Sequence, residues 1–170
     1  MVAGMTSSLK DLIINKDLKE RLSNIKKILR EDYLPYWQTN APYYTDHSER
    51  HCEAVEMNLN EMIPSDIKRK LKQYEIFLLL CGAWLHDIGM MYKQKQSEKD
   101  EKIREDHHER GRKLIREKLT ELSLDTNERH VVGEIVYAHI DRVEVNEIEE
   151  SITLRHKELG DVYIRIRLLA

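Results

Sequence analysis

The chain has 170 residues, 41% of them hydrophobic and 35% charged, and a formal net charge of −3 from 28 basic and 31 acidic residues. This length fits one ordinary domain, and the apolar content is too high for a disordered chain. The mixed, nearly balanced charge provides no general attraction to nucleic acid or to an anionic membrane surface. We therefore expect one folded domain, residues 1–170, whose partner is neither nucleic acid nor a membrane.

The sequence has few features that indicate a cellular compartment. The two cysteines, Cys52 and Cys81, lack the C-x-x-C spacing of zinc ribbons and redox motifs. The N-terminal segment has no apolar core like that of a signal peptide, and the longest apolar stretch, residues 76–85, is about half of a membrane span. These features predict a soluble, cytoplasmic protein.

The first 42 residues form an expected helix followed by an aromatic loop. Apolar residues recur at mostly three- and four-residue steps over residues 8–30, which is helical spacing. Pro35 and Pro42 then bracket a tyrosine-rich segment, and prolines this close together do not continue a helix. Residues 43–170 would form the core of the domain.

Two helical segments are expected next. Thr45 and Asp46 are good capping residues for a second helix that runs to about Met62. A third helix or helix pair covers residues 66–91, the most apolar part of the chain, and this segment should form the centre of the core.

The second half alternates polar and helical segments. Residues 93–106 are almost entirely polar, which suits either a lid over a site or a solvated connector. Helical spacing resumes over residues 107–122, and Asp125 or Thr126 can cap a helix that runs to residue 139. Residues 141–160 look irregular.

The last segment is ambiguous. It reads as a strand by alternation at residues 163–167, or as a helix that starts at Asp161 and is still apolar at Ala170. An apolar end of this kind, with Ile164, Ile166, Leu168 and Leu169 partly uncovered, would favour formation of a homo-oligomer.

Four histidines lie on apolar faces of the predicted helices. Their neighbours at helical spacing are Val55, Leu59 and Met62 for His51; Leu79, Ala83 and Met90 for His86, which adjoins Asp87; Gly111, Leu114 and Ile115 for His107; and Val132, Ile135 and Val136 for His139. One inward histidine is more often a core residue than a ligand. Four of them with a carboxylate need more hydrogen-bond partners than an apolar core offers, whereas a divalent cation satisfies all of them.

This donor set predicts a site for one or two transition-metal ions, such as Mn, Fe, Ni, Co or Zn. Ca is a poor fit, because it prefers oxygen ligands. A site with open coordination positions can activate water for attack on phosphorus.

Four short runs carry a family resemblance: HCEAV from His51, LHDIG around His86 and Asp87, HHERG from His107, and YAH ending at His139. In this order they resemble the HD-domain superfamily of metal-dependent phosphohydrolases, from about Tyr43 onward. The sequence of these runs is most similar to the branch of HD domains found ahead of chaperone-type (GHKL) ATPase modules. The resemblance implies an all-α, HD-domain-like helical bundle with the metal site between its central helices.

It also implies roles for individual residues. The implied metal ligands are His51, His86, Asp87, His107 and His139, with Asp87 bridging if two ions are bound and with His86 and Asp87 as the catalytic pair. Arg50 and Arg110 could clamp phosphate, although an arginine beside a buried position is more often in an ordinary salt bridge. His47 could face the substrate or orient a ligand, and a plain surface role is an equal alternative. His108 would be a neighbour of the ligands or exposed, and His130 and His156 would lie at the surface.

One family feature is not found. The family normally closes its site with an Asp on a late helix, and the chain stops at Leu168, Leu169 and Ala170, where that run would begin. We expect either that the chain is a fragment of a longer protein or that Asp141 or Asp161 takes this place.

The resemblance implies hydrolysis of a phosphoester, in a nucleotide or a phosphodiester, by metal-activated water. The alternative is a regulatory module that senses a nucleotide and signals to an attached ATPase domain, with little hydrolysis of its own.

Overall fold

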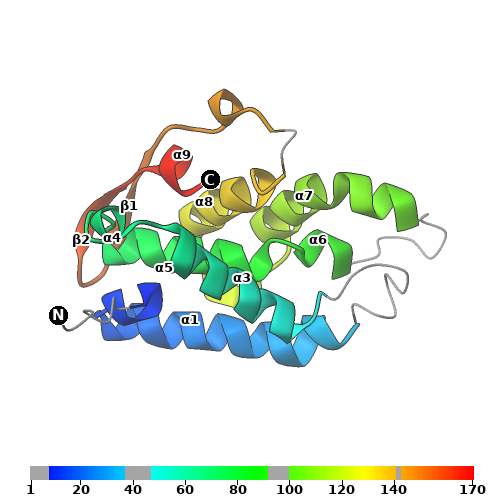
Figure 1. The fold of residues 1–170 in the computed structure, drawn as a ribbon, viewed down its shortest axis with the longest axis horizontal. Coiled ribbons are helices and arrows are strands. Elements are labelled where there is room, and N and C mark those ends of the chain that lie inside the picture. The colour runs from blue at the N-terminus through cyan, green and yellow to red at the C-terminus, as the bar shows by residue number, and fades with distance from the viewer. Residues whose placement is uncertain (1–7, 37–46, 92–99, 141–142) are drawn as a thin grey trace.

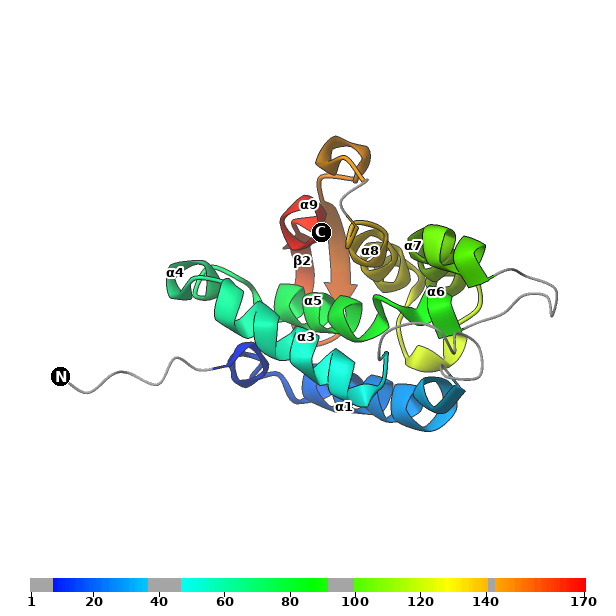
Figure 2. The same ribbon diagram turned by 45° about the vertical axis from the view of Figure 1, so that its right-hand side comes forward.

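The computed structural model describes residues 8–36, 47–91, 100–140 and 143–170. These residues are mostly helical, with one small two-stranded sheet, so the all-α prediction is confirmed. Helix α5 (Gln73–Leu85) runs through the middle and is buried from Tyr74 to Leu85. It packs against α1 (Lys16–Ile28), α3 (Glu49–Met62) and α8 (Thr126–Tyr137), as Figures 1 and 2 show.

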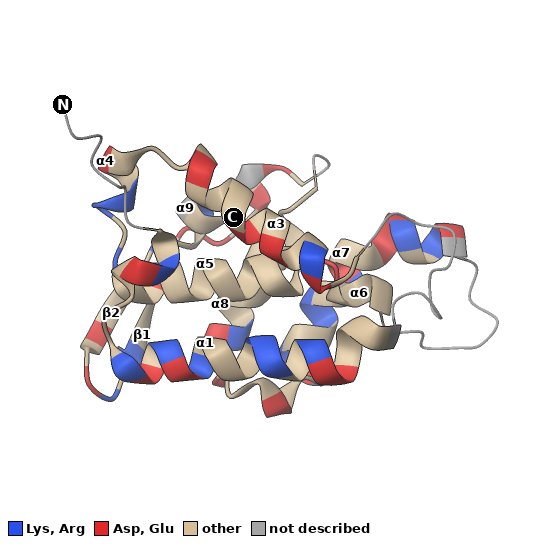
Figure 3. Ribbon diagram, turned by 60° about the horizontal axis from the view of Figure 1, so that its bottom comes forward, with Lys and Arg blue, Asp and Glu red and all other residues tan. Residues whose placement is uncertain are grey.

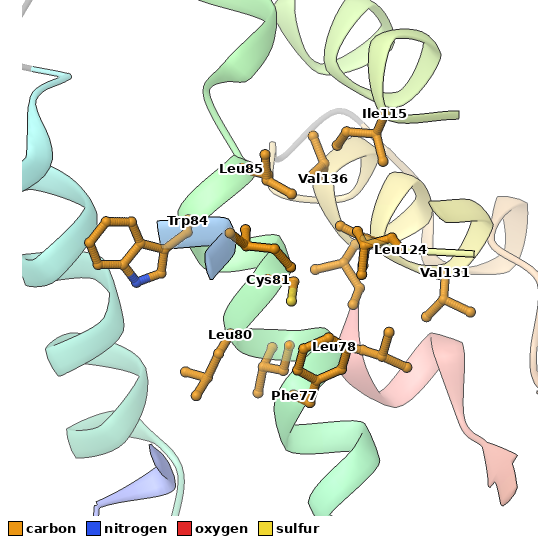
Figure 4. Packing of buried hydrophobic residues seen from close by; sticks show 14 of the residues in the cluster. Phe77, Leu78, Leu80, Cys81, Trp84, Leu85, Ile115, Leu124, Val131 and Val136 are labelled. Carbon is orange, nitrogen blue, oxygen red and sulfur yellow. The ribbon is translucent and has the colours of Figure 1, made fainter. Parts of the chain in front are cut away.

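The core surrounds α5, and part of it lies between α5 and α8. Phe77, Leu78, Cys81 and Leu85 point from α5 toward Val131, Val136 and the preceding Leu124 (Figure 4). In Figure 3 the α5 ribbon is almost free of charged residues, whereas α1 carries many along its length. The segment Gln73–Met91 is long and apolar enough to cross a membrane, but 94% of it is buried inside the fold. Such burial is typical of the core helix of a soluble protein.

The N-terminal helix is shorter than predicted. A 3-10 turn over Leu9–Leu12 precedes α1, and Asn15 caps α1 by accepting a hydrogen bond from the Leu18 N–H at 3.0 Å. The predicted helix is therefore interrupted at residues 13–15, because the Asn15 side chain accepts a hydrogen bond from a backbone N–H group at the start of α1. After α1, a π-turn over Leu29–Tyr33 and a 3-10 turn over Leu34–Tyr36 lead out of the helix.

Helix α3 ends at Met62 as predicted, but its N-cap is Ser48. Thr45 and Asp46, the predicted caps, lie outside the described residues. The predicted apolar stripe is only partly buried, because Met62 is 77% exposed and Cys52 is the residue that α3 buries. The third segment is divided into α4 (Ser65–Lys68), α5 and α6 (Ile88–Met91).

Helix α7 (Asp100–Glu117) starts seven residues before His107, so part of the predicted polar connector is helical. The remainder of that connector, residues 93–99, lies outside the described residues. A 3-10 turn over Thr120–Leu122 follows α7. Helix α8 starts after Asp125 as predicted, and Asp125 and Glu128 form a capping box.

The C-terminal segment contains a β-hairpin that we did not predict. Strands β1 (Ile152–His156) and β2 (Gly160–Ile164) pair antiparallel, and the short helix α9 (Ile166–Leu169) follows. The Arg165 guanidinium fastens this segment to α5 by donating to both carboxylate oxygens of the fully buried Glu75, at 2.8 and 2.6 Å. The expectation that this segment leaves Ile164, Ile166 and Leu169 uncovered is wrong, since all three are buried.

His156 is also buried, at 5% exposure, although we expected it at the surface. Its Nδ1 accepts hydrogen bonds from the backbone N–H groups of Glu158 and Leu159, and its Nε2 lies 3.2 Å from Asp17 Oδ2 on α1. A histidine at the end of a strand can thus serve as a structural link between a hairpin and a helix.

Candidate metal centre

The ends of α3, α5, α6 and α8 and the middle of α7 meet around Asp87. His51 lies in the first turn of α3, and His86 and Asp87 form the turn between α5 and α6. His107 lies on α7, and His139 lies two residues beyond Tyr137, the last residue of α8. The structure therefore brings together all five residues expected as ligands, with the His-Asp pair at a helix break rather than inside a helix.

The two oxygens of the Asp87 carboxylate face different histidines. Oδ2 lies 2.8 Å from His86 Nε2 and 3.3 Å from His51 Nε2. Oδ1 lies 3.7 Å from His107 Nε2 and 3.9 Å from His139 Nε2. Two pairs of histidines thus share one carboxylate, and in this arrangement Asp87 could bridge two ions.

The spacing of the imidazole nitrogens fits metal coordination. His51 Nε2 and His86 Nε2 are 3.0 Å apart, and His107 Nε2 and His139 Nε2 are 2.8 Å apart. Two ligands bound to one ion at about 2.1 Å lie about 3.0 Å apart at a right angle and about 3.4 Å apart at a tetrahedral angle. Each pair is therefore close to the distance that a shared ion requires.

Backbone carbonyls orient three of the rings. The Nδ1 atoms of His86, His107 and His139 lie 2.8, 2.5 and 2.5 Å from the carbonyl oxygens of Ala83, Arg104 and Val136, respectively. A carbonyl oxygen only accepts, so each Nδ1 carries the proton and each neutral ring keeps its lone pair on Nε2. This is the tautomer that a metal ligand needs, fixed by the hydrogen bond on the opposite side of the ring.

The electrostatics of the centre keep Asp87 ionised. Burial opposes ionisation of this carboxyl, but hydrogen bonds with His47, His51 and His86 hold its pKa well below the usual value. Burial also lowers the pKa of His86, but the neighbouring Asp87 carboxylate outweighs it and the pKa is raised. Burial, with the nearby His107, lowers the pKa of His139 to about 4, which keeps its Nε2 lone pair free at neutral pH.

Two glycines allow the helices to come this close. A Cβ placed on Gly89 of α6 would lie 2.0 Å from the carbonyl oxygen of His107 and 2.8 Å from the backbone nitrogen of Gly111. A Cβ on Gly111 would meet Val136 Cγ1 at 2.9 Å. The backbone of α6 therefore packs directly against the backbone of α7. This contact sets the distance between Asp87 and His107. The sequence pattern does not predict this role, although both glycines stand within the runs that carry the ligands.

His47 lies against the carboxylate, not at the surface. Its Nδ1 is 2.8 Å from Asp87 Oδ2, and its side chain is 14% exposed. His47, His51 and Asp87 form one group able to hold a metal ion, and Asp87, His107 and His139 form another. Two roles at the site were expected for His47, contact with the substrate and orientation of a ligand. This position suits the second.

The remaining candidates are exposed or have other partners. Arg50 is exposed on α3, and the Arg110 Nε–H donates to the Gly89 carbonyl at 3.3 Å, which joins α7 to α6. His108 is buried and stacks on Tyr137, with ring centroids 5.4 Å apart. Burial, with the nearby His107, lowers the pKa of His108. His130 has a side chain that is 33% exposed, with its Nε2 2.6 Å from Glu149.

Neither acid considered as a closing ligand is found near the centre in the described part of the chain. Asp161 pairs with Arg155 at 3.0 Å on the exposed side of the hairpin and belongs to neither metal group. Asp141 lies outside the described residues.

Comparison with known proteins supports the identification of this centre. A family model described as HD-CE matches residues 41–170, which include every residue of both metal groups. Searches of curated proteins and of solved structures returned no match. The matched range covers most of the chain, and the chain therefore belongs to the HD-CE family and contains an HD-type domain.

Proposed function

We propose that this domain is a metal-dependent hydrolase of phosphoesters, acting on a nucleotide or a phosphodiester. One observation carries the proposal: each oxygen of Asp87 faces its own pair of imidazole nitrogens, at 2.8 and 3.3 Å on one side and 3.7 and 3.9 Å on the other. An arrangement of this kind suits two divalent ions a few ångströms apart, as in phosphatases and nucleases.

The cofactor would be one or two transition-metal ions, with Mn, Fe, Ni, Co or Zn compatible with imidazole and carboxylate donors. When bound, such ions activate water and neutralise phosphate oxygens. His51, His86 and Asp87 would hold the first position, and Asp87, His107 and His139 would hold the second.

The residues of the chain prepare the site in two ways. The carbonyl contacts of His86, His107 and His139 fix the rings before a metal arrives, so little rearrangement is needed on binding. The His51 side chain is 33% exposed and that of Asp87 is 8% exposed, so solvent reaches the centre on the His51 side. A phosphorylated substrate would approach from there. Arg50, on the same turn of α3, is available to the substrate, whereas Arg110 already bonds to Gly89.

A second function remains a candidate because Asp87 is the only carboxylate in the two metal groups among the described residues. Carboxylates offset cation charge, and a centre with one of them can bind a nucleotide without turning it over efficiently. In this alternative the domain senses a nucleotide and regulates an attached ATPase domain. Both functions suit the cytoplasm.

The test combines metal analysis with turnover. Wild-type protein and the Asp87→Asn variant are loaded with Mn²⁺, desalted and analysed for metal, then assayed with bis-p-nitrophenyl phosphate and a panel of nucleotides. Asp161→Asn is the matched control, since that carboxylate pairs with Arg155 at the surface. We expect Asp87→Asn to lose metal and turnover and Asp161→Asn to retain both.

Different results separate the alternatives. Metal binding and nucleotide binding without turnover would favour the sensing module. Metal retained in Asp87→Asn at the wild-type ratio would contradict the proposed centre. Loss of metal in Asp161→Asn would mean that this acid closes the site in solution. Chelator should also lower the melting temperature of the loaded wild-type protein, because an ion that binds only the folded state stabilises it.

A further inference from the structure

We infer that His47 is itself a metal ligand, binding through Nδ1 and completing the first position beside His51, His86 and Asp87. This inference rests on the proposed metal centre and adds His47, for which the sequence predicts a substrate contact, an orienting group or a plain surface role. It starts from the distance of 2.8 Å between His47 Nδ1 and Asp87 Oδ2.

The position of His47 meets the requirements for a ligand. Its ring is edge-on to His51, with centroids 5.5 Å apart, and donor atoms of His47, His51 and Asp87 all lie within 4.8 Å of one another. Ligands bound at a right angle around one ion lie about 3.0 Å apart, so a separation of 2.8 Å fits a shared ion as well as it fits a hydrogen bond. The side chain is 14% exposed and thus already held in place.

The number of donors supports the same assignment. Without His47 the first position has three protein donors, His51 Nε2, His86 Nε2 and Asp87 Oδ2, and Asp87 is shared with the second position. Within the described residues no second carboxylate joins either group. Transition-metal ions such as Mn and Fe take up to six ligands, so His47 can supply a fourth protein donor and still leave positions for water.

The competing role is that of a positioning residue, in which the Nδ1–H group of His47 donates to Asp87 without touching the ion. The two roles differ in where the proton lies. A ligand has its lone pair on Nδ1 and its proton on Nε2, whereas a hydrogen-bond donor has its proton on Nδ1. The rings of His86, His107 and His139 carry Nδ1–H because each faces a carbonyl oxygen. His47 would therefore show the opposite tautomer from these three in the metal-bound protein.

Nitrogen NMR reads this difference directly. The whole chain is labelled with ¹⁵N-histidine, and long-range ¹H–¹⁵N correlation spectra are recorded with and without Zn²⁺, with the rings assigned from single variants. We expect Zn²⁺ to leave the Nδ1 of His47 unprotonated and shifted and its Nε2 protonated, with the reverse pattern for His86. A protonated His47 Nδ1 in the Zn²⁺-bound protein would overturn the assignment.

Affinity provides a second readout. In His47→Asn the amide nitrogen stands where Nδ1 stood and can still donate to Asp87, whereas His47→Ala removes both roles. We expect both variants to bind the first Zn²⁺ at least about 10-fold more weakly in competition with a chromophoric chelator. His130→Gln, which changes a histidine bonded to Glu149, is the control and should match wild type. Wild-type affinity in His47→Asn would show that donation to Asp87 is sufficient, and it would refute the assignment.

The experiment also separates this inference from the proposed function. If Zn²⁺ shifts the rings of His51, His86, His107 and His139 but not that of His47, the metal centre stands and the assignment of His47 fails. If Zn²⁺ shifts none of these rings, both fail together.

Discussion

Replacing Gly89 by alanine tests whether the contact between α6 and α7 sets the geometry of the metal centre. The added Cβ would lie 2.0 Å from the His107 carbonyl oxygen, 2.9 Å from the carbonyl carbon and 2.8 Å from the Gly111 nitrogen. All three are backbone atoms, so no side chain can rotate to make room. Since real Cβ contacts are longer than 3.0 Å, the two helices must separate by about 1 Å.

A displacement of this size affects stability and metal binding differently. Overpacking of a close contact costs about 1–3 kcal/mol, and in a domain of this size about 2 kcal/mol lowers the melting temperature by roughly 4–8 °C. Metal–ligand distances tolerate only about 0.2 Å, so moving Asp87 away from His107 should weaken the second position roughly 100-fold or more. The first position is affected less, because His86 and Asp87 move together.

The assay is Zn²⁺ stoichiometry by calorimetry and by native mass spectrometry, combined with thermal unfolding of the metal-free protein. We expect two ions per chain in the wild type and one in Gly89→Ala. Gly133→Ala is the control: the atoms nearest to its Cβ would belong to the flexible side chains of Arg112 and Arg116, at 3.4 Å. In the interior of α8, alanine is favoured over glycine by about 0.5–1 kcal/mol. Two ions and an unchanged melting temperature in Gly89→Ala would refute this account of the centre.

Two further predictions concern stability. The folded-state pKa of His139 is about 4 against an ordinary value of 6.5, so as the pH falls from 6.5 to 4 the unfolded chain takes up a proton that the folded chain does not. The metal-free wild type should therefore lose stability over this range more steeply than His139→Gln in urea titrations at several pH values, and parallel curves would contradict the burial argument. Separately, the buried Glu128 accepts from Tyr74 at 2.5 Å and pairs with Arg21. Glu128→Gln should cost roughly 3 kcal/mol of unfolding free energy with no change in metal content, whereas the exposed Glu20→Gln should be nearly neutral in the same denaturation assay.

The local sequence determined most of the helices and the residues gathered at the centre. The cap at Asp125 was readable because a capping box depends on residues three positions apart. The histidines stood out because helical spacing places each of them beside apolar neighbours, and those neighbours are buried for His86, His107 and His139. Periodicity was less reliable at the ends of elements, where Asn15 broke the first helix and α7 began earlier than its apolar pattern.

Only the tertiary structure decided which groups touch. Helical spacing tells which face of a helix is buried but not which helix covers it, so it could not reveal that the two oxygens of Asp87 face different histidines. Nor could it place His156 against Asp17, because 139 residues separate them in the chain. The contact of Gly89 with the backbone of His107 depends on how two helices cross. Distances between elements arise from the packing of the whole core, and for that reason the residues of the centre were predictable from the sequence while their geometry was not.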